Sequence, residues 1–248
     1  MTQVIGHRGA SRDERENTLA AFRAARSQGA DGVELDVRRT ADGRLAVHHD
    51  AHLPDGRAIV ETTWENMPVP VPDLAAALEA CRGFGTVNVE IKNWPDDVDF
   101  DESLAIVDAV VDTLRELTDD LRAVLLVSCF HLPTLDRVRA LDPELATAWL
   151  VIGPGVGPGT ETLRADGDVV AATVAAVAER GHRALHPHHA FVDADLVTAA
   201  HEVGIEVNTW TVDDPDRIRW LAGAGVDAVI TNAPADALAA LGRPPAVG

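Results

Sequence analysis

Residues 184–231 read ALHPHHAFVDADLVTAAHEVGIEVNTWTVDDPDRIRWLAGAGVDAVIT, and their pattern decides the fold class. Short apolar segments typical of buried strands alternate here with amphipathic segments that are long enough to be helices. The predicted strands lie at 184–188, 205–211 and 227–231, and the predicted helices at about 193–203 and 215–223. A strand, a helix and a second strand in this order join parallel neighbours of one sheet. The stretch therefore predicts an α/β fold with a parallel sheet.

The same alternation extends from this stretch to both ends of the chain. Five further strands are predicted at 3–7, 32–38, 87–92, 123–128 and 146–152. Six further helices are predicted at about 17–28, 73–82, 101–117, 132–141, 169–180 and 234–241. Eight strand–helix units in 248 residues predict a closed (β/α)8 TIM barrel, whose usual length is about 250 residues. We expect residues 1–248 to form this barrel as a single domain.

Three segments interrupt the alternation. Residues 40–50 (TADGRLAVHHD) predict a hairpin, because Ala-Asp-Gly favours a turn and the residues after it alternate in polarity. Residues 51–72 then form a short, proline-containing insertion after the second strand. The Gly- and Pro-rich residues 153–159 follow the fifth strand, where barrels carry their active sites, so they form either a mobile lid or a plain flexible loop.

The composition excludes several classes of partner. The 40 acidic and 21 basic residues give a formal charge of −19, and such a surface repels nucleic acid and anionic lipid headgroups. No apolar run approaches the ~20 residues that cross a bilayer, and a strand that begins by Val4 is no signal peptide. Two cysteines, Cys81 and Cys129, are too few for a disulfide framework. We therefore expect a cytoplasmic protein without stable membrane association.

Two acidic residues on the second strand indicate a metal site. Glu34 and Asp36 are two positions apart, so their side chains point to the same face of the strand. A pair of carboxylates on an otherwise apolar strand is costly unless it is neutralised. A divalent cation is one solution, and oxygen ligands favour Mg²⁺, Ca²⁺ or Mn²⁺ over Zn²⁺. The alternative is an ion pair with Arg38 or another base.

The third strand repeats this spacing with Glu90 and Lys92. Glu90 can complete a site of three carboxylates, and Lys92 can hold a phosphate oxygen. Alternatively, the two side chains pair only with each other. We favour the metal, because a local pair leaves Glu34 and Asp36 unexplained.

Two histidines supply groups for acid–base chemistry near neutral pH. His7 ends the first strand and His49 ends the predicted hairpin, so both return to the same rim of a barrel. Cleavage of a phosphodiester needs a base or nucleophile on one side and an acid at the leaving oxygen on the other. Negative charge also develops on the phosphoryl oxygens, and Arg8 and Lys92 are the nearby cations in the sequence.

With these residues in place, the chain resembles the glycerophosphodiester phosphodiesterase family, also called glycerophosphoryl diester phosphodiesterases. The matching motifs follow the family's order over nearly the whole chain. They are Gly6-His7-Arg8-Gly9-Ala10, Glu16-Asn17-Thr18, Glu34-Leu35-Asp36-Val37, Asp42-Gly43, His49-Asp50, Glu90-Ile91-Lys92, Trp210-Thr211-Val212 and Ile230-Thr231.

The resemblance implies a TIM barrel of the phospholipase C-like phosphodiesterase type and hydrolysis of glycerophosphodiesters to glycerol 3-phosphate and an alcohol. By this resemblance His7 and His49 are the catalytic pair, and Glu34, Asp36 and Glu90 bind Mg²⁺ or Ca²⁺, with Mn²⁺ as a further option. Arg8 and Lys92 are implied to contact the phosphate and Trp210 to line the glycerol side. Ser128 is expected at the rim as a substrate contact, and Glu16 is expected to orient the loop that carries Arg8.

The chain departs from the family pattern at two informative places. The family often has Thr-Asp-x-Pro at the last strand, whereas this chain has Thr231-Asn232-Ala233-Pro234, so any ionic role at position 232 is lost. The insertion after His49 lacks the family's Leu-x-Arg-Thr-Thr, which leaves the alcohol side of the pocket undefined.

Three histidines, His186, His188 and His189, gather at the sixth strand without an assigned role. They are either a second metal or phosphate site or barrel-end packing residues with polar tips, and we favour packing.

Two other functions remain as alternatives. The same acidic site can serve a lysophospholipase D-like enzyme or another phosphodiesterase, although few aromatic residues at the rim argue against a lipid chain. A barrel that only binds phosphorylated ligands is the non-catalytic alternative, and the presence of both histidines and all three carboxylates argues against it.

Overall fold

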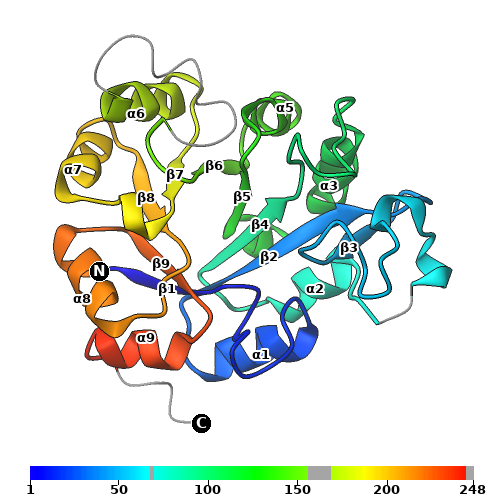
Figure 1. The fold of residues 1–248 in the computed structure, drawn as a ribbon, viewed down its shortest axis with the longest axis horizontal. Coiled ribbons are helices and arrows are strands. Elements are labelled where there is room, and N and C mark those ends of the chain that lie inside the picture. The colour runs from blue at the N-terminus through cyan, green and yellow to red at the C-terminus, as the bar shows by residue number, and fades with distance from the viewer. Residues whose placement is uncertain (68–69, 156–168, 244–248) are drawn as a thin grey trace.

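The computed structural model describes residues 1–67, 70–155 and 169–243, and within them eight parallel strands close into a barrel, as predicted. The barrel strands are β1 (Gln3–Gly6), β2 (Gly32–Arg39), β4 (Thr86–Ile91), β5 (Leu125–Cys129), β6 (Ala146–Val151), β7 (Ala184–Pro187), β8 (Glu206–Thr209) and β9 (Ala228–Thr231). Sequential strands are neighbours, and β1 pairs with both β2 and β9, which closes the ring (Figure 1).

Helices cover the outside of this ring (Figure 1). They are α1 (Leu19–Ser27), α2 (Leu74–Ala80), α3 (Ala105–Arg115), α4 (Asp119–Arg122), α5 (Leu132–Leu141), α6 (Val169–Glu179), α7 (Ala194–Glu202), α8 (Pro215–Ala224) and α9 (Pro234–Ala240). Each predicted helix is present, and the short α4 was not predicted. Across residues 1–67, 70–155 and 169–243, every helix is too short or too polar to traverse a lipid bilayer.

Polar side chains fix several helix starts. Thr18 accepts a hydrogen bond from Ala21 N at α1, Asp73 from Ala76 N at α2, and Asp214 from Asp216 N at α8. The start of α3 differs from the prediction by four residues. Asp101 accepts from Ser103 N and Ile106 N, and the chain turns through Leu104 at φ 60° before the helix begins.

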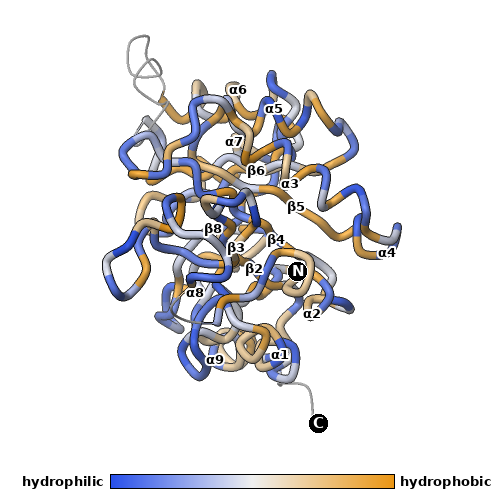
Figure 2. The backbone as a smooth tube through the Cα atoms, turned by 90° about the vertical axis from the view of Figure 1, so that its right-hand side faces the viewer, coloured by the Kyte–Doolittle hydropathy of each residue, from blue (hydrophilic) through white to orange (hydrophobic). Residues whose placement is uncertain are grey.

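Apolar side chains fill the layer between the strands and the helices. One buried cluster includes Phe22, Val33 and Val110, and a second includes Trp149, Leu185 and Val229 on the other half of the ring. Figure 2 shows the apolar segments running along strands such as β5, while the hydrophilic segments gather in the loops. Cys81 and Cys129 are both free and buried in this structure, in keeping with packing roles.

The predicted hairpin is confirmed. The strand β3 (Leu45–Val47) runs antiparallel to β2, and Val37 lies opposite Val47. The turn passes through Gly43 at φ 80°. The insertion that follows contains two short 3₁₀ helices, Ile59–Glu61 and Trp64–Asn66, and buries Leu53 and Ile59 against Ala46. Its residues 68–69, and residues 156–159 of the expected lid or loop, lie outside the described residues.

Candidate active site

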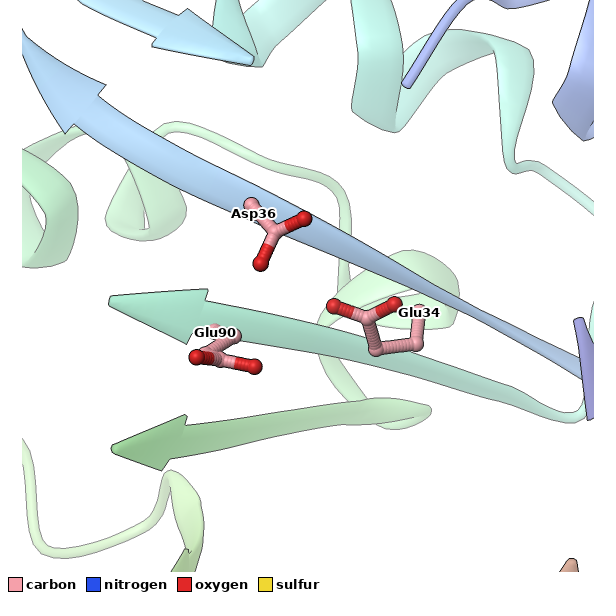
Figure 3. A group of neighbouring side chains, drawn as sticks. All are labelled: Glu34, Asp36 and Glu90. Atoms are coloured by element: carbon pink, nitrogen blue, oxygen red, sulfur yellow. The ribbon is translucent and has the colours of Figure 1, made fainter. Parts of the chain in front are cut away.

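Three carboxylates converge at one mouth of the barrel. Glu34 and Asp36 project from β2 and Glu90 from β4, and the strand register sets Asp36 beside Glu90. One oxygen of each side chain lies within 4.8 Å of the corresponding oxygens of the other two (Figure 3). Among the described residues this is the single group of three or more His, Cys, Asp or Glu side chains that can hold a metal ion.

Glu34 is the member whose charge is hardest to accommodate. Its side-chain Oε2 accepts a hydrogen bond from the backbone nitrogen of Arg8 at 2.8 Å. Its other oxygen, Oε1, is buried and has no hydrogen-bond partner. Burial, and then the charges of Asp36 and Glu90, raise the pKa of Glu34 well above its usual value. The protein without a bound cation therefore disfavours the ionised form of Glu34.

Asp36 is also fully buried but has a different electrostatic environment. Burial alone would raise its pKa, but the charges of Lys92 and Arg8 outweigh that effect and lower the pKa to about 2. Lys92 Nζ lies 3.6 Å and Arg8 Nε 3.2 Å from the Asp36 carboxylate. Asn17 donates to Asp36 Oδ2 at 2.7 Å and accepts from the Asp36 backbone nitrogen.

The alternative of an ion pair with Arg38 or another base holds only in part: Asp36 pairs with Arg8 and Lys92, but Arg38 points elsewhere. Its guanidinium contacts both oxygens of Asp99 at 2.6 and 2.7 Å and Asp97 at 2.9 Å. Its Nε donates to the backbone oxygen of His49 at 2.7 Å. Arg38 therefore supports the segment that carries His49 and leaves the acidic cluster without its charge.

Glu90 and Lys92 form the local pair that the sequence offered as an alternative. Lys92 Nζ lies 2.6 Å from Glu90 Oε1, and the Glu90 side chain is 12% exposed. Burial would lower the pKa of Lys92, but the charges of Glu90 and Asp36 raise it. The pair does not exclude a metal, because Glu90 still lies within the cluster of three carboxylates.

The loop after β1 brings His7 and Arg8 to the same mouth. Arg8 and Gly9 both have positive φ, 55° and 89°, so the chain turns sharply after His7. Arg8 Nη1 contacts the two carboxylate oxygens of Glu16 at 2.9 and 3.1 Å. Glu16 thus lies where a residue that orients Arg8 would lie.

His7 contacts Asn232, a residue to which the sequence pattern assigned no functional role. Its Nδ1 lies 2.7 Å from Oδ1 of Asn232, which follows β9. Burial and the charge of Arg8 lower the pKa of His7, against the opposing effects of Asn232 and the acidic cluster. A neutral imidazole with its Nδ1 engaged leaves Nε2 for chemistry.

His49 has a similar arrangement with a carboxylate as partner. Its Nδ1 lies 2.7 Å from Asp50 Oδ1, and 31% of its side chain is exposed. Asp50 itself is 72% exposed. The Nε2 atom of His49 is therefore also left free of this contact.

Two adjoining cavities connect these groups. The first, which we call the catalytic cavity, has a volume of about 150 Å³. Seven of the nine predicted site residues line it: His7, Arg8, Glu34, His49, Glu90, Lys92 and Trp210. The second, the side cavity, measures about 270 Å³ and includes Asp50, Trp94 and Asp97 in its lining. His49, Glu90, Lys92 and Phe130 line both cavities, so these four residues stand between them.

The other two predicted residues lie differently. Asp36 belongs to the acidic cluster but is 1% exposed. Ser128 is fully buried on β5, its hydroxyl has no hydrogen-bond partner, and it is not among the residues that line the catalytic cavity. Trp210 forms part of the wall, where its ring meets Phe130 edge-on at 5.6 Å between centroids.

His186, His188 and His189 lie on or just after β7, the strand predicted at 184–188. They do not form a second metal-binding group within the described residues. His186 is completely buried, and its Nε2 lies 3.0 Å from the side-chain nitrogen of Asn208. His188 and His189 stack with their ring centroids 4.5 Å apart. These contacts agree with the packing role that we favoured.

Comparison with known proteins identifies the family of the chain. The model of the glycerophosphoryl diester phosphodiesterase family matches residues 7–236. The chain belongs to this family. Its members are phosphoric diester hydrolases, and this protein is accordingly an enzyme that hydrolyses glycerophosphodiesters.

Relatives of the family match along nearly their whole length. A glycerophosphodiester phosphodiesterase of Caldanaerobacter subterraneus subsp. tengcongensis is 29% identical over 94% of this chain and 95% of its own. A putative glycerophosphoryl diester phosphodiesterase from Silicibacter pomeroyi has a TM-score of 0.83 at 27% identity and covers 97% of this chain and 93% of its own. A phosphodiesterase of Oleispira antarctica, solved in complex with the product sn-glycerol-3-phosphate, has a TM-score of 0.79 at 27% identity, with 98% and 97% covered.

Proposed function

We propose that this family member hydrolyses glycerophosphodiesters to glycerol 3-phosphate and an alcohol with a divalent cation held by Glu34, Asp36 and Glu90. The observation that carries the proposal is the buried, unpartnered Oε1 of Glu34 beside two further carboxylates. Leaving such an oxygen charged and unpaired is costly, whereas a hard cation would satisfy it. An all-oxygen donor set suits Mg²⁺ or Ca²⁺, with Mn²⁺ as a further option.

When bound, the cation would supply Lewis-acid stabilisation of the negative charge that develops on the phosphoryl oxygens. Arg8 and Lys92 line the same cavity and add positive charge there. Both side chains are largely buried, 17% and 10% exposed, and both already contact Asp36. We assign them to the phosphate, which they can reach without leaving the carboxylates that orient them.

His7 and His49 divide the proton transfers between them. We assign His7 as base or nucleophile, because its lowered pKa keeps the ring neutral near pH 7. We assign His49 as the acid, because the contact of its Nδ1 with Asp50 Oδ1 at 2.7 Å fixes the ring and leaves Nε2 for the leaving oxygen. The attacking group is then water, the neighbouring glycerol hydroxyl or a nitrogen of His7.

The two cavities suggest how a diester would lie. His49 stands between the catalytic cavity and the side cavity, which is where an acid would meet the leaving oxygen. The glycerol phosphate half would then occupy the catalytic cavity beside Trp210, and the alcohol would enter the side cavity. The product found in the Oleispira antarctica neighbour, sn-glycerol-3-phosphate, supports the same reaction here.

The test is turnover of glycerophosphocholine, glycerophosphoethanolamine and a lysophospholipid, each with Mg²⁺, Ca²⁺ or Mn²⁺ and each with EDTA. We expect hydrolysis of the two water-soluble diesters and its loss with EDTA. His7→Ala and His49→Ala should each lower kcat by about 10² to 10⁴-fold or more. His52→Ala is the matched control, because His52 is exposed and does not line the catalytic cavity.

Three results would contradict the proposal. Hydrolysis of no diester with any of the three metals would favour a barrel that only binds phosphorylated ligands. Preferred hydrolysis of the lysophospholipid would favour the lipid-directed alternative. Full activity in both histidine variants would remove the two-histidine mechanism.

A further inference from the structure

The carboxylate of Asp213 is linked to His7 through the side chain of Asn232. No sequence motif pointed to Asp213. Asn232 contacts His7 Nδ1 through its oxygen, and its amide nitrogen donates to Asp213 Oδ2 at 2.6 Å. Asp213 lies between β8 and α8. Its other oxygen, Oδ1, accepts from the backbone nitrogen of Asn232 and from the hydroxyl of Thr231, each at 2.8 Å. Both Asp213 oxygens are therefore committed to the residues that end β9.

These contacts decide which way the Asn232 amide faces. A carboxylate can only accept hydrogen bonds, so the amide NH₂ must face Asp213 and the amide oxygen must face His7. The hydroxyl of Ser11 lies 2.8 Å from the same amide oxygen and can donate to it. With an oxygen opposite, His7 Nδ1 must carry the proton, and Nε2 is left as a free lone pair.

We propose that Asp213 is a positioning residue that sets the tautomer of His7 by fixing the orientation of the Asn232 side chain. The proposal rests on the catalytic role assigned to His7 under the proposed function. Asn232 itself carries no charge, in keeping with the expectation that an ionic role at position 232 is lost. The chain retains a carboxylate, supplied from the loop after β8 rather than from position 232 itself.

The mechanism operates through hydrogen-bond geometry. Asp213 is exposed to solvent, so its charge acts on His7 only weakly through space. The side-chain amide of Asn232 between them is uncharged. Its orientation decides whether His7 Nδ1 faces a hydrogen-bond acceptor or a donor. A reversed amide would present NH₂ to Nδ1, shift the ring proton to Nε2, and remove the lone pair of that nitrogen.

Asp213→Asn tests this arrangement directly. The new amide would present a donor to Asn232, which favours reversal of the Asn232 side chain and the Nε2-protonated form of His7. Loss of the correct tautomer costs a catalytic histidine between about tenfold and about 10⁴-fold in kcat. We expect such a fall in kcat with KM nearly unchanged, because neither Asp213 nor Asn232 lines the catalytic cavity.

Two further variants separate this role from general damage. Asp214→Asn makes the same charge change one residue away, at a side chain that caps α8, and should retain parental kcat. The exchange Asp213→Asn with Asn232→Asp restores a carboxylate oxygen opposite His7, with a donor behind it. This double variant should recover most of the kcat lost in Asp213→Asn.

The deciding measurement is the protonation of the two ring nitrogens of His7, read from ¹⁵N–¹H correlation spectra of histidine-labelled protein. His7→Gln identifies the His7 signals. We expect Nδ1–H in the parent and in the double variant, and Nε2–H in a substantial share of Asp213→Asn molecules.

Nε2–H in the unmodified protein would overturn the inference without any variant. An unchanged tautomer in Asp213→Asn would overturn it too, whether kcat falls or not, because a fall would then come from lost structure. Since the spectra do not depend on turnover, they test the positioning role separately. Failure of the proposed function would appear in His7→Ala instead, as retained activity.

Discussion

At the scale of single residues, Glu34 and Asp36 differ sharply although they lie two positions apart on one strand. Both are buried, yet the pKa of Glu34 is raised and that of Asp36 is lowered to about 2. The difference comes from the cations, because Lys92 and Arg8 contact Asp36 directly, whereas Glu34 receives only a backbone hydrogen bond. Glu34 is therefore the carboxylate whose charge depends most on a bound cation.

Glu34→Gln tests whether the charge of Glu34 depends on a bound cation. It should weaken metal binding without lowering the stability of the metal-free protein. We expect the affinity for Mg²⁺ to fall on the order of tenfold or more, because one anionic ligand is lost. A raised pKa in the folded state means that ionised Glu34 destabilises the metal-free protein at pH 7. Glutamine removes that cost, so metal-free Glu34→Gln should melt no lower than the metal-free parent.

Calorimetric titration with Mg²⁺ and melting curves with and without EDTA measure both effects. The parent should melt higher with metal, since a ligand of the folded state stabilises it. Glu79→Gln is the matched control: it removes one charge from a chain of formal charge −19 at a side chain that is 66% exposed and lies outside the cluster. Parental affinity in Glu34→Gln would refute the ligand assignment, and a clearly lower melting point without metal would contradict the cost of a buried, ionised Glu34.

Residue types explain which parts of the site could be predicted. The carboxylates, Lys92 and the two histidines stand out in the sequence because their chemistry is unusual on apolar strands and at strand ends. Asn17, Asn232 and Asp213 were not predicted as functional neighbours, since an amide or a loop aspartate has many ordinary roles. Their functions come from partners that only the fold supplies, such as the contact of Asn232 with His7, 225 positions away.

At the scale of elements, the hydrophobic pattern identified every barrel strand and its helix. The strands are short apolar segments that are buried on both faces, and the helices between them are amphipathic. The boundaries were less predictable. The strand expected at 205–211 is regular only over Glu206–Thr209. Beyond it, Trp210 forms an isolated bridge with His188, and Asp213 accepts hydrogen bonds from the end of β9. The departure from regular strand geometry therefore coincides with the residues that hold His7.

The close contact between the β1 loop and α1 is a second element-scale feature. A Cβ added to Gly9 would lie 2.5 Å from the backbone carbon of Ala21 and 2.7 Å from its oxygen. The same loop is anchored by a hydrogen bond from Ala10 N to Ala21 O at 3.0 Å. Gly9 thus allows the helix to support the turn that presents His7 and Arg8.

Gly9→Ala should displace this loop and lower both stability and activity. Alanine at positive φ costs about 1–2 kcal/mol, and overpacking against a rigid backbone adds about 1–3 kcal/mol. We expect a loss of roughly 2–5 kcal/mol in the free energy of unfolding, measured with urea. The kcat should fall as well, because His7 and Arg8 move with the loop.

Gly43→Ala is the matched control for backbone strain. Gly43 has a similar φ of 80° but no atom within 4 Å of an added Cβ. Its replacement should cost only the conformational part, about 1–2 kcal/mol, and leave kcat unchanged. Equal losses of stability in the two variants would mean that the contact with α1 does not constrain the loop.

At the scale of the whole molecule, closure of the barrel creates the site. The pairing of β1 with β9 brings the N-terminal His7 loop beside Asn232, and the pairing of β2 with β4 sets the carboxylates together. Sequence periodicity predicts a closed barrel, but it does not specify which side chains meet inside. The interior consequently holds polar groups that were not foreseen, among them the contact between His186 and Asn208.

His186 links this polar interior to the pH dependence of the whole fold. Burial lowers its pKa to about 3, from an ordinary value of 6.5. Below pH 6.5 the unfolded chain binds a proton at this position that the folded chain refuses, so stability is lost as pH falls toward 3. Each pH unit in that window removes up to about 1.4 kcal/mol. Asp36, whose pKa is lowered to about 2, adds to the loss of stability only when the pH falls below its ordinary pKa of 3.8.

Urea unfolding at pH 6.5 and pH 5.0 should therefore separate the parent from His186→Gln. Glutamine can still accept from Asn208 but does not titrate, so the parent should lose about 2 kcal/mol more than the variant between the two pH values. His52→Gln, at an exposed position, controls for the loss of any histidine. The same loss of stability in the parent and in His186→Gln would mean that the folded barrel admits the proton, and that its interior is wetter or more open than the buried contact with Asn208 implies.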